Sequence, residues 1–461
     1  MIAASKLSRT PYGCHEIAHT WTSSCPKSWL DVGIPGVREA MKIYLPLFMI
    51  SRLIKAKKLD KSTLQKLAKE TLQSSTFLGA NCYFFLSCFC FVRSLPFIPA
   101  RESIMLAAFM SSYMAIFLER EDRRNALTVY MTNVASETLF NILKARGLVP
   151  QVPHGERLLA IATLATIFYM HKQGKCEGLL GTLTKTLLGT VEVCPPPGDG
   201  RGQEPSAGAR LVQYVVRLVR GARPPPSPRR PLTVARHPCC PHAGGCAPYA
   251  AAGLCESLLL GVALQTGVTA AGGLLRLVTT SRPPAPPAAA ALLRLGFGLG
   301  SLSGLFRLVS CLLRRQRGRD DAWHALPAGA VAAAVGLRFF SSRSLTLYLF
   351  WKTVEACYWR GAASGRLPRP PGGGALLYAL STGLVLSAAV LEPHQIRRSY
   401  WTFLRQLTGG HVAQMNWPLI AHCCGADTLR LEELRRYRPV FNADDVRAAS
   451  LPLLRQLGQL L

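Results

Sequence analysis

The sequence is poor in acidic residues and lacks the local patterns of the common enzyme classes. Only 25 of its 461 residues are Asp or Glu. It contains no glycine-rich phosphate-binding loop, no G-x-S-x-G nucleophile elbow and no kinase signature. These absences argue against nucleotide-dependent and acyl-transfer enzymes. We therefore expect that the protein is not an enzyme.

The chain also lacks the marks of secretion. Its first 40 residues contain no apolar run of the kind that a signal peptide requires, and no Asn-x-Ser/Thr acceptor for N-glycosylation occurs. The 15 cysteines are odd in number and lie largely within apolar stretches, as Cys82, Cys88 and Cys90 do. Free or buried thiols are therefore expected rather than a disulfide framework.

Apolar residues dominate the sequence. Hydrophobic residues make up 49% of the chain and charged residues only 17%, which is too apolar for an ordinary soluble protein. A membrane-spanning helix needs about 20 mostly apolar residues. The strongest candidates are 71–92, 103–118, 257–275 and 371–391. Weaker candidates, each shortened by a charge or a small-residue break, are 41–54, 125–143, 158–170, 288–313, 322–340 and 345–359. The sequence predicts an all-α, polytopic membrane protein whose solvent is the lipid bilayer.

Basic residues outnumber acidic residues by 54 to 25, which gives a formal net charge of +29. Membrane proteins carry such an excess in loops on the cytosolic face, next to anionic lipid. No basic stripe interleaved with aromatic residues and no zinc-finger spacing accompanies the charge. Nucleic acid is therefore not expected as a partner.

Composition divides the chain into five segments. A stretch rich in Pro and Arg, including Arg223-Pro-Pro-Pro-Ser-Pro-Arg-Arg-Pro, separates two apolar blocks and is typical of a flexible linker. The predicted segments are a cysteine-rich N-terminal cap (1–40), a first membrane helix block (41–193), a Pro/Arg-rich linker (194–248), a second membrane helix block (249–392) and a basic helical C-terminal tail (393–461).

An internal similarity relates the two helix blocks. Residues 127–150 align with 345–368 at a constant offset of 218, and seven of the 24 columns are identical. Chance composition would give about one or two identities. We interpret this as a duplication, so that the bundle consists of two pseudo-repeated halves joined by the linker.

The alignment pairs Glu137 with Glu355, and both lie in apolar surroundings. A carboxylate is costly to bury in lipid, so a matched intramembrane pair can mark a transport path between the repeats. The structural alternative is that each Glu lies at the headgroup level or pairs with a nearby base, such as Lys352 three residues before Glu355. Both interpretations remain open on the sequence alone.

The N-terminal segment contains two patterns that suggest metal chemistry. His15-Glu-Ile-Ala-His19 matches the short zincin pattern, but Pro11 and Gly13 precede it closely, so a stable catalytic helix is not expected. The second is a Cys/His set of Cys14, His19 and Cys25, completed by linker residues among Cys239, Cys240, His242 and Cys246. Structural zinc at this set is the only cofactor that the sequence suggests, and an unmetallated cap is the alternative.

Several segments resemble the transmembrane protein 135 family. They are Cys14-His-Glu-Ile-Ala-His19-Thr-Trp21 with Cys25, Met41-Lys-Ile-Tyr-Leu-Pro-Leu, Leu127-Thr-Val-Tyr-Met-Thr-Asn-Val-Ala-Ser-Glu-Thr-Leu-Phe140 and Arg398-Ser-Tyr-Trp-Thr-Phe-Leu-Arg-Gln-Leu-Thr408. Residues 195–290 differ most from the family. The resemblance implies a multi-pass protein of peroxisomal and mitochondrial membranes, also called peroxisomal membrane protein 52, with a distant likeness to the small mitochondrial inner-membrane translocase subunits.

The resemblance also implies a function in organelle organisation. The expected role is regulation of the mitochondrial fission and fusion balance and of peroxisome organisation, by recruiting or activating a dynamin-like fission GTPase through the linker and the cap. The alternative hypothesis is a lipid or solute transporter, or a pore, at the repeat interface. The family offers no established catalytic residue.

Overall fold

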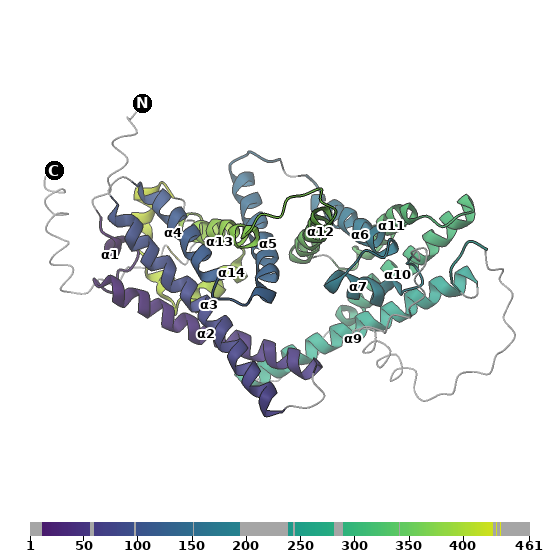
Figure 1. Cartoon of the computed structure of the whole chain (residues 1–461), viewed down its shortest axis with the longest axis horizontal. Helices are drawn as coiled ribbons and strands as arrows, with labels where there is room; N and C mark the ends of the chain where they lie inside the picture. Colours follow the sequence, from purple (N-terminus) through teal and green to yellow (C-terminus); the bar gives the residue numbers. More distant parts are fainter. Residues whose placement is uncertain are drawn as a thin grey trace. The chain divides into compact units, whose positions relative to one another are not determined.

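The computed structural model of the chain is helical throughout the part that it describes (Figure 1). The described residues are 12–55, 60–95, 98–150, 152–193, 238–242, 245–280, 289–340 and 342–426, with positions 430 and 434. No strand occurs among them, which confirms the prediction of an all-α fold. The linker prediction lies mostly outside the described residues, since 194–237 are not among them.

The helices form two compact units. The first contains residues 1–150 and 369–461, and the second contains residues 151–368. The helices of the first unit are α1 (Cys14–Ile17), α2 (Cys25–Lys55), α3 (Lys61–Ser94), α4 (Ala100–Ile116), α5 (Glu121–Ala145), α13 (Gly373–Leu391), α14 (Arg398–Leu407) and α15 (Trp417–Cys424). Those of the second are α6 (Gly155–Lys172), α7 (Gly178–Leu188), α9 (Cys246–Thr280), α10 (Ala289–Arg317), α11 (Ala325–Gly336) and α12 (Arg343–Ala363).

Local side-chain chemistry sets several helix ends. The Asp60 carboxylate accepts a hydrogen bond from the Lys61 backbone N–H at the start of α3, and such caps satisfy donors that the first helical turn leaves open. Glu121 and Asp122 occupy the first turn of α5, where the helix dipole favours negative charge. Gly147, two residues beyond the end of α5, has φ +70°, a conformation that favours glycine.

Four helices in the described part of the chain are long and apolar enough to cross a bilayer: α3, the Cys246–Ala270 part of α9, the Leu292–Arg317 part of α10, and α13. They correspond to three of the four strongest predictions and to one of the six weaker ones, 288–313; the other five weaker stretches are not among these four helices. The remaining prediction, 103–118, falls on α4, which has only 17 residues. At 1.5 Å per residue α4 is about 25 Å long, which is short of the hydrocarbon thickness of about 30 Å. The chain is a multi-pass membrane protein.

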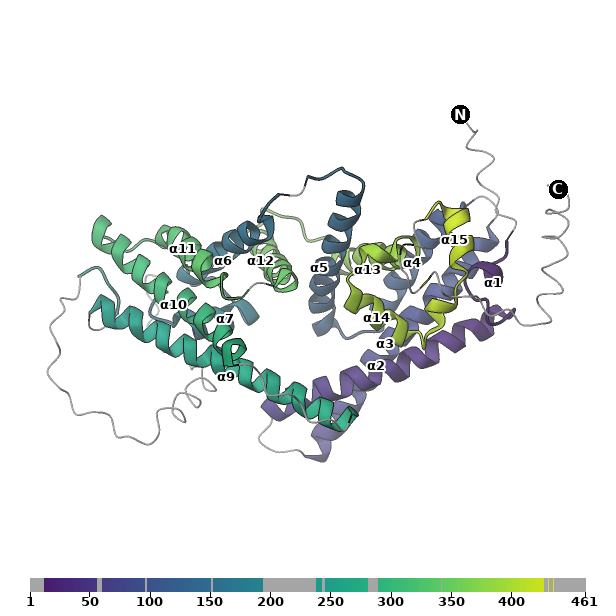
Figure 2. The same cartoon turned by 180° about the vertical axis from the view of Figure 1, so that it is seen from behind.

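Each unit contains helices from both halves of the sequence: α13, α14 and α15 belong to the first unit, and α6 and α7 belong to the second. Helix α13 packs against α4 and α5 in the first unit, whereas α6 packs against α11 and α12 in the second. Figures 1 and 2 show both arrangements from opposite sides. The units therefore cut across the predicted blocks 41–193 and 249–392, because α6 and α13 bury their apolar faces away from the helices that precede them in the chain.

The start of the predicted C-terminal tail is part of the first unit. Trp401 on α14 and Trp417 on α15 are buried, and their rings meet edge to face with centroids 5.9 Å apart. Leu404 and Leu407 of α14 are buried as well. Residues 398–424 thus contribute core side chains, because the apolar face of α14 covers α2 rather than a lipid surface.

Candidate functional site

The first unit brings Cys14, His19, Cys25 and Cys90 together, with all four ligand atoms within 4.8 Å of one another. Cys14 begins α1, His19 follows that helix, Cys25 begins α2, and Cys90 lies in the last turns of α3. The three residues proposed from the sequence therefore do meet. The predicted completion from the linker is wrong: the fourth member is Cys90. Cys240, His242 and Cys246 belong to the second unit.

The spacing of these atoms fits a tetrahedral metal ion. The Sγ atoms of Cys14 and Cys25 are 3.4 Å apart, and His19 Nε2 lies 3.6 Å from Cys25 Sγ and 3.5 Å from Cys90 Sγ. Around a tetrahedral Zn²⁺, bond lengths of about 2.3 Å to sulfur and about 2.05 Å to nitrogen place two sulfurs about 3.8 Å apart and a sulfur and a nitrogen about 3.6 Å apart. Three Cys and one His are a common ligand set of structural zinc.

The imidazole of His19 is held with Nε2 toward the sulfurs. Its Nδ1 lies 2.9 Å from the Thr22 carbonyl oxygen, so Nδ1–H donates to that oxygen and Nε2 keeps its lone pair. His19 is fully buried, and its ring meets Trp21 edge to face at 6.3 Å. Trp21 in turn stacks on His411 at 4.4 Å. A backbone hydrogen bond and an aromatic neighbour thus fix a metal-binding orientation.

Electrostatics favours a thiolate in this cluster. A hydrogen bond with Cys90 is the main cause that lowers the pKa of Cys14 to about 3, against the effect of burial, and hydrogen bonds with His19 and Cys25 act in the same direction. Burial alone would lower the pKa of His19, but the hydrogen bonds to Cys14 and to the Thr22 carbonyl oxygen and the charge of Cys14 together raise that pKa. The thiolate is the form of cysteine that binds metals.

The zincin-like pattern has a different role in the structure. Helix α1 is only four residues long, and Glu16 Oε2 accepts a hydrogen bond from the Gly13 backbone N–H at 2.6 Å. Glu16 therefore caps a helix start, while His15 is not part of the cluster. Of the two histidines in the pattern, only His19 faces the cysteines.

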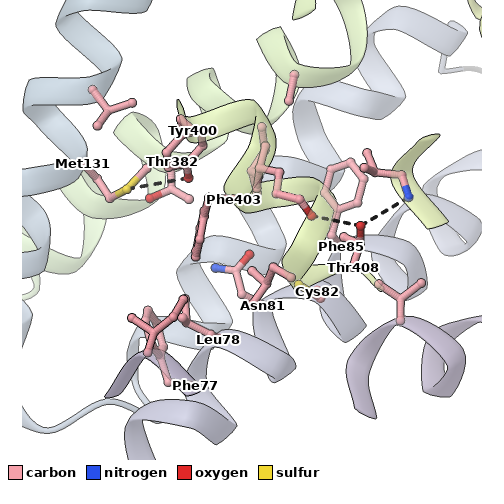
Figure 3. A pocket seen from close by; sticks show the side chains of 18 of the residues that line it. Phe77, Leu78, Asn81, Cys82, Phe85, Met131, Thr382, Tyr400, Phe403 and Thr408 are labelled. Atoms are coloured by element: carbon pink, nitrogen blue, oxygen red, sulfur yellow. Dashed lines mark hydrogen bonds between the residues drawn. The ribbon is translucent and has the colours of Figure 1, made fainter. Parts of the chain in front are cut away.

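Next to the cluster lies an apolar cavity of about 550 Å³ within the first unit. Helices α2, α3, α5, α13 and α14 form its walls, and the segment after α14 completes them. Figure 3 shows side chains of α3, α5, α13 and α14 around this space, including Phe77, Met131, Thr382 and Phe403. Two of the wall helices, α3 and α13, are candidate membrane spans.

The charged groups on the cavity wall are neutralised. Arg123 Nη1 lies 3.3 Å from the buried carboxylate of Glu119, and its guanidinium lies over the Tyr44 ring. Arg397 pairs with Glu137, one of the two predicted intramembrane carboxylates. The cavity therefore offers an apolar interior with an ion pair at two places on its wall.

The predicted partner of Glu137 lies in the other unit. Glu355, on α12, pairs with Lys352 Nζ at 2.6 Å, as the structural alternative proposed. Neither α5 nor α12 is among the four candidate spans in the described part of the chain. Each carboxylate thus has a basic partner within its own unit.

No solved structure matches the chain. Residues 11–144 match the family model for the N-terminal cysteine-rich region of Transmembrane protein 135. The matched region contains all four members of the first Cys/His cluster and helices α1 to α4, with nearly all of α5. This match, over 134 of the 461 residues, supports the resemblance of the chain to the transmembrane protein 135 family.

Proposed function

We propose that this membrane protein holds a lipid-like apolar molecule in the cavity of its first unit. The observation that supports this proposal is the cavity itself: about 550 Å³, almost wholly apolar, and walled by two membrane-spanning helices. Small-molecule sites commonly measure about 300–1,000 Å³ and combine apolar walls with a few polar groups. This proposal is related to the transporter hypothesis, but its ligand is a lipid and its site lies within one unit instead of at the repeat interface.

The dimensions of the cavity suit an extended apolar chain. The residues of α5 that line the cavity run from Arg123 to Val134, which corresponds to about 16 Å along the helix axis at 1.5 Å per residue. Beyond Arg123, they are Leu127, Tyr130, Met131 and Val134. Each buried CH₂ contributes about 0.8 kcal/mol, so a long acyl chain or a similar molecule gains most from such a space.

We further propose that Cys14, His19, Cys25 and Cys90 bind a structural zinc ion that shapes one wall of this cavity. Ala18 and Trp21 line the cavity, and both lie between the ligands Cys14 and Cys25. A metal held by that loop and by Cys90 of α3 would fix the loop against the helix. The ion would supply rigidity, and the cavity side chains would bind the ligand.

Filling the cavity should exclude the ligand. Leu78 of α3 lines the cavity, so we expect Leu78→Trp to lower cross-linking by a photoreactive fatty-acid analogue about tenfold, equivalent to about 1.4 kcal/mol. The measurement is mass-spectrometric mapping of labelled peptides from protein in lipid nanodiscs. Label in the unaltered chain should concentrate on peptides of α3, α5 and α14.

Leu72→Trp is the matched control, because Leu72 lies on the same helix, is exposed and does not line the cavity. This variant should label like the unaltered chain, and circular dichroism should show equal helix content for both variants. Equal labelling of Leu78→Trp and Leu72→Trp would contradict the proposal.

The role in organelle organisation stays a prediction of the family resemblance. Peroxisomal and mitochondrial residence, and recruitment of a dynamin-like fission GTPase, are proposals that the family match supports only in outline. The linker surface on which recruitment depends lies mostly outside the described residues. A protein that holds lipid in an organelle membrane is compatible with such a role.

A further inference from the structure

The second unit contains its own Cys/His cluster, made of Cys240, His242, Cys246 and Cys311. All four ligand atoms lie within 4.8 Å of one another. The Sγ atoms of Cys240 and Cys246 are 3.8 Å apart, and His242 Nε2 lies 3.3 Å from Cys311 Sγ. These separations are close to the edges of a tetrahedral zinc site, about 3.8 Å between sulfurs and about 3.6 Å between sulfur and nitrogen.

The surroundings of this cluster restrict its histidine and exclude water. Cys240, His242 and Cys311 are buried. The His242 ring stacks on Tyr249 with centroids 4.3 Å apart, and the Tyr249 hydroxyl donates to the buried Glu192 at 3.0 Å. An aromatic face and a buried hydrogen bond thus hold the imidazole in place, as neighbouring groups commonly do around metal ligands.

Two cysteines of each cluster occupy equivalent positions on two helix pairs. Cys25 is the first residue of α2, and Cys246 is the first residue of α9. Cys90 and Cys311 each lie near the end of the following long helix, α3 or α10. Both pairs of cysteines are separated by 65 residues, and the second pair follows the first at a constant offset of 221.

The helix contacts follow the same register. A Cβ atom added to Gly79 of α3 would lie 2.8 Å from the Gly33 carbonyl oxygen and 2.4 Å from Val37 Cγ2. At the offset of 221 the corresponding residues are Gly300, Leu254 and Leu258.

A Cβ atom added to Gly300 would lie 2.9 Å from the Leu254 carbonyl oxygen and 3.2 Å from Leu258 Cβ. Helices α9 and α10 therefore approach each other at the same positions as α2 and α3. Equivalent helix packing therefore places both cysteine pairs. Chance is a poor explanation for the position of the second pair.

We propose that Cys240, His242, Cys246 and Cys311 form a second zinc site, so that each chain binds two structural zinc ions. Binding would release the thiol protons to solvent and leave three thiolates and one neutral imidazole on the ion. The ion joins the start of α9 to the end of α10, as the first ion joins α2 to α3. This inference goes beyond ligand binding in the first-unit cavity.

Metal content per chain tests the proposal. Purified full-length protein in detergent should contain two zinc ions by inductively coupled plasma mass spectrometry. Cys311→Ser should lower the content to one, and Cys90→Ser should also lower it to one. Cys239→Ser is the matched control and should keep two, because Cys239 adjoins Cys240 but donates to the Gly318 carbonyl oxygen instead of joining the cluster.

Cobalt substitution of the unaltered chain gives a readout that does not depend on the folding of a variant. Titrating metal-free protein with Co²⁺ should produce thiolate-to-metal charge-transfer absorption that saturates at two equivalents. Saturation at one equivalent with zinc content unchanged by Cys311→Ser would overturn the second site, as would a disulfide between Cys240 and Cys246. If the unaltered chain held one zinc ion and Cys311→Ser removed it, the result would contradict the first site and support the second.

Discussion

Replacing Cys90 with alanine should remove one zinc ion per chain and strongly destabilise the first unit. Structural zinc binding contributes about 10–16 kcal/mol in small zinc-finger peptides, whereas whole domains are stable by only about 5–15 kcal/mol. Even a fraction of that energy would lower the stability of the unit markedly, because the proposed ion would join α1 and α2 to α3. The measurement is thermal unfolding with and without a chelator, and chelation should reproduce the effect of Cys90→Ala in the unaltered chain.

Cys88→Ala provides the control for this variant. Cys88 is also buried on α3, two residues away, but it is not part of the cluster. Its loss should produce only the modest cost of a small cavity and leave the chelator effect intact. A Cys90→Ala protein that unfolds like Cys88→Ala and still responds to the chelator would show that the first cluster holds no structural metal.

Neutralising Glu192 should destabilise the second unit. Glu192 and Arg314 form an ion pair in which both side chains are fully buried, and Arg314 Nε also lies 2.9 Å from Asp320. Breaking a buried pair by removing one charge costs about 3–5 kcal/mol, because the other charge stays buried without its full compensation. Glu192→Gln keeps the size of the side chain, so a fall in the unfolding midpoint would reflect the lost charge.

An exposed ion pair of the same unit serves as the comparison. The side chains of Arg343 and Glu156 are 59% and 32% exposed, respectively, and exposed pairs contribute about 0–1 kcal/mol. Glu156→Gln should therefore leave the unfolding midpoint nearly unchanged. If both glutamine variants shifted the midpoint equally, the buried network around Arg314 would not be the stabilising element that its geometry indicates.

Composition and hydrophobic runs predicted much of the fold. Continuous charge-free stretches identified α3, α9 and α13, because the length of an apolar run directly measures its capacity to cross a bilayer. The placement of α6 in the second unit and of α13 in the first unit could not be predicted in this way. Periodicity shows which face of a helix is apolar, but it does not show which other helix will cover that face.

The candidate site was predicted in part for a similar reason. Cys14, His19 and Cys25 are close in sequence, so their spacing alone suggested a ligand set. Cys90 lies in an apolar helix, where a single cysteine is as typical of core packing as of metal binding. The signal that could have identified it is the shared 65-residue separation of Cys25 from Cys90 and of Cys246 from Cys311.

The cavity was not visible in the sequence, because its walls come from five helices spread over nearly the whole chain. Phe77 of α3 and Tyr400 of α14 both line it although more than 300 residues separate them. Their apolar character is compatible equally with a filled core and with an open space. Only the packing of the helices decides between these outcomes.

Lipid retained by single protein molecules tests the central claim most directly. Native mass spectrometry of chains released from nanodiscs, at an activation energy that removes surface lipid, should show one lipid-sized molecule bound to the unaltered protein. Leu386→Trp, at a cavity-lining position of α13, should lose it, whereas Leu380→Trp, at an exposed position of the same helix, should keep it. Absence of retained lipid in the unaltered chain, or equal retention in both variants, would contradict the account.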